Sequence, residues 1–258
     1  MRARIRGIYA TALTRLLLDA GHEVVQASSP IRRRFEADFE TADHDVAVDA
    51  TADRRGVEIA GDPDAVTEAA AQVDDLALDA FTWADPAPRG AVFDARVTDT
   101  LGRGAVCDLG TVDGADASGF LPFDEADEHV AEGDALRVQV VDGRPPWRDG
   151  RPVLSTTVAA DAGLAALVPG EGVRVDAYDA AAGRELAGMT DLLDVDVPDG
   201  WGVRWRREAT EADMDALSSA LSRAVDRARD LDGLPEAVDA PRRLAAPRAT
   251  TWGWLGRD

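Results

Sequence analysis

Three aspartates that recur every four residues, Asp45, Asp49 and Asp53, are the first candidates for chemistry in this sequence, and His44 lies beside them. Carboxylates that converge on one point can hold the divalent metals that assist phosphodiester hydrolysis. In an extended strand the three side chains would share one face, but successive ones would lie about 13 Å apart, too far for a shared metal. A chain with 49 acidic residues also produces such spacing by chance. We therefore assign no catalytic residue and no metal site from this pattern.

Other catalytic patterns are missing from the sequence. It contains no P-loop, HExxH motif, nucleophile elbow or dinucleotide-binding fingerprint. The single cysteine, Cys107, excludes disulfides and cysteine-rich zinc sites, and it fits a reducing cytoplasm. His22 and His129 are isolated, so we expect them to be surface or packing residues. No run of about 18 apolar residues occurs, so we expect no membrane-spanning segment.

The charge of the chain is strongly negative, with a net charge of −21, and all 28 basic residues are arginines. This composition is typical of a protein that must stay hydrated in concentrated KCl, and it indicates a halophilic organism. Acidity normally argues against a nucleic-acid partner, but the Debye length is about 3 Å at 1 M salt, so bulk charge repels little there. Affinity would then depend on base stacking and on paired hydrogen bonds from arginine.

The first 86 residues have the pattern of an α/β module. Apolar residues at helical spacing follow a first strand, and Ser29 and Pro30 are typical of a helix start. The expected strands cover residues 4–9, 23–27, 45–50 and 56–61, and a further helix covers residues 64–80.

A proline-rich boundary at WADPAPRG precedes a different pattern of short strands separated by glycine. Five strands in about seventy residues are typical of a small closed barrel, which we place at residues 87–160. The expected strands are GAVFDARV, GAVCDLG, SGFLPF, ALRVQVV and PVLSTTV.

The remaining sequence returns to mixed structure. We expect an α/β module at residues 161–233, ending in a long helix that Thr210 and Asp213 would begin with capping-box spacing. Residues 234–258 are rich in proline, alanine and arginine and are expected to be a tail or linker, although Trp252 and Trp254 lie within them. The predicted fold class is α/β (α+β) with an inserted five-stranded OB-type β-barrel.

The central run GRGAVCDLG, SGFLPF and VAEGDALRVQV resembles the RNA-binding domain of ribonuclease E and polynucleotide phosphorylase. The opening RGIYATALTRLLLDAGHEVVQASSPIRRRF and the later GWGVRWRREATEADMDALSSALSRAVDRA extend the resemblance over nearly the whole chain. The sequence is therefore similar to the archaeal ribonuclease E/G-like proteins, which bind AU-rich RNA.

This resemblance implies an RNA-binding surface on the barrel. Phe120 would stack a base, with Phe93, Arg96, Arg103 and Arg137 on adjoining strands. The alternative is that Phe120 fills the barrel core, because aromatic side chains in strands are usually buried.

The resemblance also implies a phosphate site. In ribonuclease E an arginine of the GWGVRWRR-like segment helps to hold the 5′-monophosphate of RNA, and Arg206 occupies that position here, with Arg204 nearby. Ser155 and Thr156 lie in the segment whose backbone assists. Arg207 replaces the threonine of the bacterial motif. The alternative is that these arginines lie on an exposed strand without a ligand.

The function implied is that of an endoribonuclease acting on AU-rich loops in the processing or decay of ribosomal RNA. Single-stranded AU-rich RNA and ribosomal RNA precursors would be the partners, and Mg²⁺ would be the candidate cofactor of any nuclease activity. The metal-binding aspartates and zinc-binding cysteines of ribonuclease E have no counterpart here, so we expect a fragment or a naturally shortened member. The alternatives are a non-catalytic module that delivers RNA to other factors and a regulator linked to a phosphatase domain.

Overall fold

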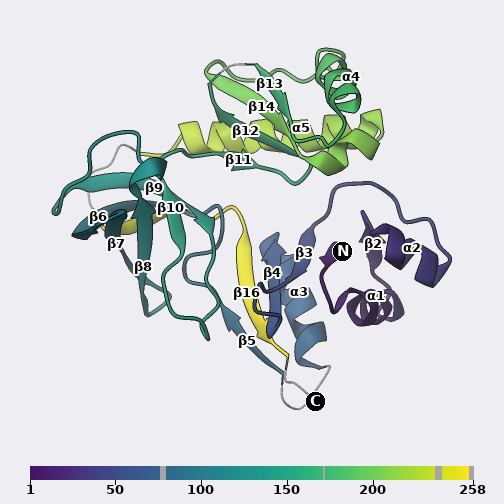
Figure 1. The fold of residues 1–258 in the computed structure, drawn as a ribbon, viewed down its shortest axis with the longest axis horizontal. Coiled ribbons are helices and arrows are strands. Elements are labelled where there is room, and N and C mark those ends of the chain that lie inside the picture. The colour runs from purple at the N-terminus through teal and green to yellow at the C-terminus, as the bar shows by residue number, and fades with distance from the viewer. Residues whose placement is uncertain (76–79, 171, 236–239, 256–258) are drawn as a thin grey trace.

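The computed structural model describes residues 1–75, 80–170, 172–235 and 240–255, and within them the strands form three sheets (Figure 1). One of these sheets closes into a five-stranded barrel, and helices accompany the other two. The predicted fold class, α/β with an inserted OB-type barrel, is confirmed. Among these residues no helix combines the length and the apolar character needed to cross a bilayer.

The first sheet is built from both ends of the chain, and its strand order is β2-β1-β3-β4-β16-β5. Helices α1 and α3 pack on it through apolar residues at helical spacing, such as Leu13 and Leu17 in α1. Helix α3 ends at Asp74, earlier than the predicted residue 80, and residues 76–79 lie outside the described residues. The elements are β1 Arg2–Arg6, α1 Ala10–Asp19, β2 Glu23–Val25, α2 Ser29–Phe35, β3 Val46–Ala50, β4 Gly56–Gly61, α3 Pro63–Asp74, β5 Phe81–Ala84 and β16 Ala249–Trp254.

The barrel has the strand order β6-β7-β8-β10-β9, and pairing of β6 with β9 closes it. Its core contains the fully buried side chains of Phe93, Leu109, Leu121 and Leu154. Leu154 packs against Gly119, where an added Cβ would lie 2.5 Å from a Leu154 methyl carbon, so this position needs glycine. The elements are β6 Val92–Leu101, β7 Gly104–Val112, β8 Ala115–Pro122, the 3-10 helix η1 Phe123–Glu125, β9 Ala135–Asp142 and β10 Val153–Ser155.

The third sheet has the order β11-β12-β14-β13, and helix α5 packs on it. The Asp213 carboxylate caps α5 by accepting a hydrogen bond of 2.8 Å from the backbone N–H of Ala216. The predicted capping box is therefore wrong in register, because Thr210 lies in the preceding 3-10 helix. The elements are β11 Ala160–Asp161, β12 Ala165–Pro169, β13 Val173–Val175, α4 Ala180–Thr190, β14 Trp201–Trp205, η2 Arg207–Glu211 and α5 Met214–Asp232.

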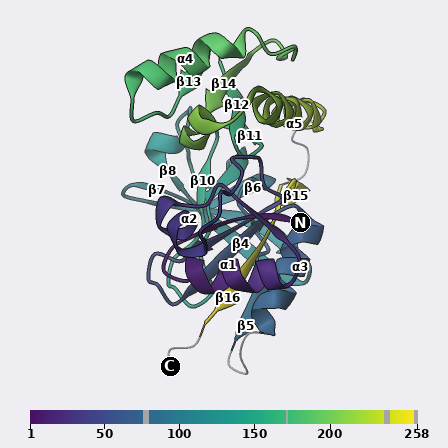
Figure 2. The same cartoon turned by 90° about the vertical axis from the view of Figure 1, so that its right-hand side faces the viewer.

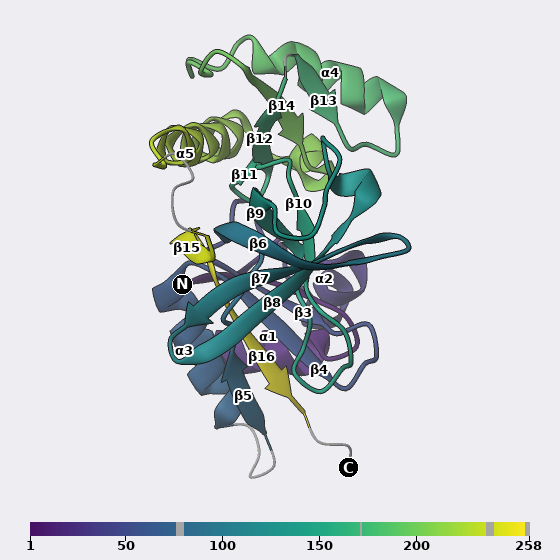
Figure 3. The ribbon, with the colours of Figure 1, turned by 90° about the vertical axis from the view of Figure 1, so that its left-hand side faces the viewer.

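The chain after α5 does not form the predicted tail. Strand β15, Arg242–Ala245, pairs with β6 of the barrel, and β16 then enters the first sheet between β4 and β5 (Figure 3). The segment ATTWGW favours a strand because threonine and tryptophan are common in strands. Its Thr250 and Trp252 side chains are buried in the sheet. Residues 236–239 and 256–258 of this segment lie outside the described residues.

The three sheets meet around one region of the molecule. Helix α5 lies across the junction of the barrel and the first sheet (Figure 1), and α1 and α3 cover the face of the first sheet that Figure 2 presents. Residues from all three sheets and from α5 line a cleft of about 740 Å³ at this junction.

Candidate nucleic-acid interface

Phe120 lies on the outer face of the barrel. Its neighbours in β8, Gly119 and Leu121, are buried, whereas Phe120 is half-buried and lies outside the core cluster. Strand alternation explains this, because consecutive side chains face opposite sides. The ring lies over Gly104, where an added Cβ would come within 2.6 Å of its Cζ atom. Phe120 therefore does not fill the core, and the stacking role stays a prediction.

Phe93 has no part in such a surface. Its side chain is completely buried among the core residues of the barrel. A base could reach it only if the barrel opened, so Phe93 is corrected from a predicted RNA contact to a core residue.

Two exposed residues accompany Phe120 at the end of the barrel. Arg103 lies in the turn between β6 and β7, and its carbonyl accepts a 3.0 Å hydrogen bond from the backbone N–H of Phe123. The Phe123 side chain is 42% exposed. Phe123 ends the expected strand SGFLPF, and because aromatic side chains in strands are usually buried, the sequence pattern does not mark it as an RNA contact. We refer to Phe120, Phe123 and Arg103 as the barrel face.

Arg96 and Arg137 are engaged by the protein itself. Arg96 donates to the carbonyl oxygens of Gly133 at 3.1 Å and Ala240 at 3.2 Å. Arg137 donates to the buried Asp94 at 3.2 Å and to the carbonyl of Pro235. Both guanidinium groups thus tie the segment after α5 to the barrel, and their predicted contact with RNA has no support from this arrangement.

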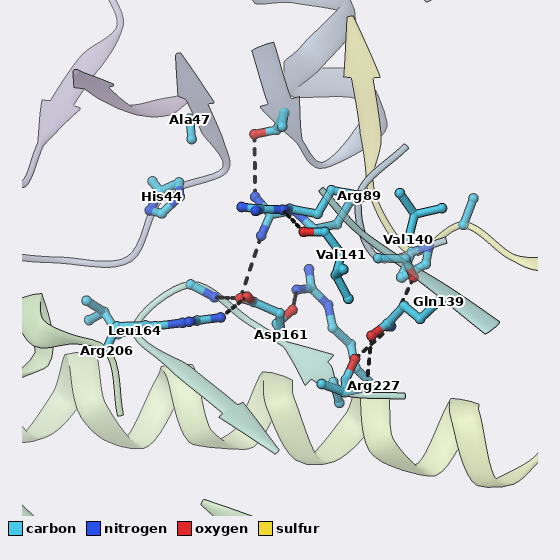
Figure 4. Close-up of a pocket in the computed structure, with 18 of the residues that line it drawn as sticks. His44, Ala47, Arg89, Gln139, Val140, Val141, Asp161, Leu164, Arg206 and Arg227 are labelled. Carbon is cyan, nitrogen blue, oxygen red and sulfur yellow. Dashed lines mark hydrogen bonds and ion pairs between the residues drawn. The ribbon is translucent and has the colours of Figure 1, made fainter. Parts of the chain in front are cut away.

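The cleft between the sheets is rich in arginine (Figure 4). Six arginines and five acidic residues line it, although the whole chain has 28 basic and 49 acidic residues. The cleft is thus the place where positive charge is concentrated in an acidic protein. The six arginines are Arg4, Arg89, Arg204, Arg206, Arg227 and Arg248.

Arg206 forms the central ion pair of this cleft. Its Nη2 atom lies 2.5 Å from Oδ2 of Asp161, and Nη1 of Arg248 lies 3.9 Å from Oδ1. The backbone N–H of Gly163 donates to the same carboxylate at 3.0 Å. Burial acts to raise the pKa of Asp161, but Arg206 and Arg248 outweigh it and the pKa is lowered. Asp161 is therefore an anion held where arginines converge.

Arg204 and Arg207 have separate partners. Arg204 binds Asp176 through two nitrogens, with a shortest separation of 3.0 Å between Nη2 and Oδ2. Arg207 lies 3.7 Å above the ring centroid of the exposed Tyr178. Arg204 and Arg206 both line the cleft, whereas Arg207 is not among its lining residues, and the predicted phosphate-binding role of Arg204 and Arg206 stays a prediction.

Thr156 and Arg206 line different clefts. The Thr156 hydroxyl accepts from the backbone N–H of Asp127 and lies 3.0 Å from the carboxylate of the same residue. It borders a second cleft of about 440 Å³ together with Arg137 and Trp201. Ser155 is buried, and its hydroxyl accepts from the backbone N–H of Thr157 at 3.1 Å. The structure therefore does not bring Thr156 to the phosphate position expected beside Arg206.

His44 forms part of the cleft wall (Figure 4) and is uncharged at neutral pH. Burial, followed by the charges of Arg4 and Arg248, lowers its pKa to about 3. Its Nδ1 atom lies 3.4 Å from Nε2 of Gln26, so the ring can accept a hydrogen bond there. A neutral imidazole adds no charge to the cleft and leaves the arginines to attract an anion.

The three aspartates do not converge. Asp45 accepts from the backbone N–H of Arg2 at 2.6 Å, and Asp49 pairs with Arg4 at 2.6 Å. Asp53 lies in a turn and accepts from Trp147 at 3.1 Å. In the described parts of the chain no group of three or more histidine, cysteine or acidic side chains is placed to hold a metal ion.

Several archaeal proteins are similar to this chain over its full length. Probable ribonuclease FAU-1 of Natronomonas pharaonis is 47% identical over 263 residues, a match that covers 100% of this chain and 54% of the relative. The Halobacterium salinarum protein of the same name is 46% identical, with 100% and 55% covered. The Thermococcus kodakarensis protein is 31% identical, with 89% and 47% covered. The chain is homologous, over its whole length, to about half of each of the two halophile proteins, which are named probable ribonucleases. No family model matches it.

The FAU-1 homologues confirm the resemblance to archaeal ribonuclease E/G-like proteins, and several of them come from halophilic archaea. The chain spans about half the length of the curated relatives it matches. The match to the Natronomonas pharaonis protein therefore spans the first sheet, the barrel and the third sheet.

Proposed function

We propose that this chain is an RNA-binding part of an archaeal ribonuclease that cleaves RNA internally. Its ligand would be single-stranded, A/U-rich RNA from ribosomal precursors in the cytoplasm. The observation that carries the proposal is the position of Phe120 on the outer face of a closed OB-type barrel, in a chain homologous to probable ribonucleases FAU-1. Barrels of this kind bind oligonucleotides on the strand face that bears Phe120.

The barrel face offers two kinds of contact with a single strand. Phe120 and Phe123 present rings for base stacking, which tolerates any base because every base has a π face. Arg103 lies exposed on the adjoining turn and can hold a phosphate through its guanidinium fork. Both contacts are short-ranged and therefore persist in concentrated salt, where long-range attraction is screened.

The arginine cleft offers a place for a phosphate group. Asp161 is bound there by Arg206 and Arg248, and a phosphate could replace it because it is also an anion with several acceptor oxygens. Displacement would leave Asp161 to reorient toward water through its 36% exposed side chain. On this account Arg206 binds a terminal phosphate only in competition with an internal carboxylate.

The test of this proposal is binding of a fluorescent A/U-rich single strand by the native chain in concentrated KCl. Binding that is weakened by Phe120→Ala, with no change for Leu192→Ala, supports the barrel face. Leu192 is a suitable control because it is an apolar residue, 75% exposed, that lies between α4 and β14 and outside the barrel. Absence of binding by the native chain contradicts the proposal.

A second candidate is a non-catalytic module that delivers RNA to other factors. It is favoured by the engagement of Asp45, Asp49 and Asp53 with three different partners, Arg2, Arg4 and Trp147. Incubating the chain with precursor ribosomal RNA, with and without Mg²⁺, separates the two candidates. Cleavage that the triple aspartate-to-asparagine variant abolishes would place an active site in the first module and exclude the delivery role.

A further inference from the structure

Aromatic side chains gather at the seam between the first sheet and the barrel. Ring centroids lie 6.1 Å apart for Phe81 and Trp83, 5.7 Å for Trp83 and Trp147, and 5.1 Å for Trp147 and Trp254. We call these four residues the aromatic row. Because aromatic residues make up only 5% of the chain, this concentration is a specific feature of the seam.

Three parts of the chain build the row: β5, the loop between β9 and β10, and β16. Phe81 and Trp83 lie on β5, where Phe81 pairs with Trp254 and Trp83 pairs with Trp252 of β16. Trp147 comes from the barrel loop between β9 and β10 and lies on Gly56, where an added Cβ would come within 2.9 Å of its ring. Figure 1 shows β5 and β16 beside the lower end of the barrel, where this contact occurs.

The N–H groups of Trp147, in the row, and of Trp252, beside it, have hydrogen-bond acceptors within the protein. Nε1 of Trp147 donates to Asp53 at 3.1 Å, and Nε1 of Trp252 donates to Asp85 at 2.8 Å. These bonds fix the ring orientations. Within the row, the N–H of Trp147 is thus engaged by Asp53, which leaves the face of its ring to contact a ligand.

The outer end of the row is open to solvent. Phe81 is 56% exposed and Trp83 is 41% exposed, although large aromatic side chains usually bury most of their surface. Trp252 is almost completely buried at the seam, so packing explains an aromatic residue there. Packing does not explain the exposed rings of Phe81 and Trp83. Phe81 and Trp83 therefore remain without a structural explanation.

Arginines lie near one end of the row, together with the Asp53 carboxylate that Trp147 contacts. The guanidinium carbon of Arg55 lies 6.0 Å from the ring centroid of Trp254. Arg54 precedes it in the same turn, and Arg148 follows Trp147 in the barrel loop; all three are exposed. Aromatic rings flanked by guanidinium groups have the composition of a surface that binds single-stranded nucleic acid.

The same loop connects the row to the barrel face. It continues from Trp147 to Pro152, whose carbonyl accepts a 2.9 Å hydrogen bond from the backbone N–H of Phe120. Arg151 donates to Ser118, two residues before Phe120 in β8, at 3.2 Å. In OB-type barrels the loop between the fourth and fifth strands borders the oligonucleotide site. A strand of RNA that leaves Phe120 along this loop would reach the row.

We propose that the aromatic row is a second RNA-binding surface, on which Phe81 and Trp83 stack bases of a single strand that also contacts the barrel face. This inference rests on the proposed RNA-binding function and adds a longer path for the same ligand. Binding of another protein would not require arginines beside the row. Because the chain as a whole is acidic, the arginines at this place favour a nucleic-acid ligand.

The first test compares two lengths of A/U-rich RNA on the 258-residue chain, one of about 6 and one of about 20 nucleotides, because one OB fold covers about 4 to 16. Trp83→Ala should raise the Kd of the long RNA about 5- to 150-fold, as loss of one stacked base does, and leave that of the short RNA unchanged. Phe120→Ala should weaken both. Tyr178→Ala is the matched control, since Tyr178 is an aromatic residue, 86% exposed, that lies between β13 and α4 and outside the barrel.

The second test does not depend on a variant that folds. A long RNA carrying 4-thiouridine is crosslinked by light to the native chain, and crosslinks are expected on the peptide containing Phe81 and Trp83. Loss of affinity only with Phe120→Ala, and no crosslink on that peptide, overturns the row but leaves the proposed function standing. Failure of the native chain to bind either RNA overturns both. A native dimer that Trp83→Ala converts to a monomer would instead assign the row to self-association.

Discussion

Nη2 of Arg206 lies 2.5 Å from Oδ2 of Asp161, so the arginine expected to bind phosphate is already paired with an anion of the chain itself. The two residues are 45 positions apart and come from β11 and from the end of β14. On the proposed function, a 5′-phosphate that binds Arg206 would have to compete with this carboxylate. The free energy of phosphate binding is therefore the difference between the contact of Arg206 with the phosphate and its contact with Asp161.

Replacing Asp161 should strengthen phosphate recognition. Asp161→Asn removes the competing charge, so RNA with a 5′-monophosphate should bind better to the variant than to the native chain, while RNA with a 5′-hydroxyl should change little. Arg206→Ala should remove any preference between the two ends. The measurement is the ratio of the two Kd values for each protein, and equal binding of both RNAs by native and variant chains would contradict the role of Arg206.

Acid should weaken the contribution of Asp161 to stability. Its pKa is lowered in the folded chain because Arg206 and Arg248 outweigh the opposing effect of burial. The stabilisation is therefore complete above the unfolded value of about 3.9 and is lost as pH falls through the lower folded value. Urea midpoints of the native chain and Asp161→Asn should thus differ at pH 6, and the difference should shrink as pH falls through the lowered pKa of Asp161. A gap independent of pH would mean that charge is not the cause.

Phe120 and Phe93 should respond in opposite ways to the same substitution. Phe120→Ala removes a ring from the outer face and should weaken RNA binding by about 1 to 3 kcal/mol with little loss of stability. Phe93→Ala leaves a cavity in the barrel core and should lower the free energy of unfolding by about 3 to 5 kcal/mol. Fluorescence anisotropy and urea denaturation of both variants measure the contrast. Equal destabilisation by the two substitutions would assign Phe120 to the core.

The returning strand β16 should be essential for the first sheet. Trp252 is 3% exposed and lies between β4 and β5, where it pairs with Glu58 and Trp83. Trp252→Ala should lower the free energy of unfolding by about 3 to 5 kcal/mol, as expected for a large aromatic side chain in a buried site. Trp201→Ala, on the half-buried start of β14, is a control expected to have a smaller effect. Unchanged stability of Trp252→Ala would mean that the segment behaves as a tail after all.

Glycine spacing and strand alternation predicted the barrel, because those signals are local to each strand and turn. Alternation also indicates that Phe120 and Leu121 face opposite sides, but it does not say which side is the core. The contact of β16 with β4 joins residues almost 200 positions apart and leaves no local pattern, so the prolines and arginines before it suggested a linker. The pairing of Arg206 with Asp161 was missed for the same reason, since the two residues are 45 positions apart and no local spacing connects β11 with β14.

Binding of RNA by the barrel face is tested by the Kd of the native chain for an A/U-rich single strand, measured from about 0.5 to about 3 M KCl beside a duplex of the same sequence. The single strand should bind with a shallow dependence on salt, because stacking on the barrel face carries the affinity, and the duplex should bind more weakly. Absence of binding, equal affinity for the duplex, or a steep loss of affinity with salt would contradict this role of the barrel face.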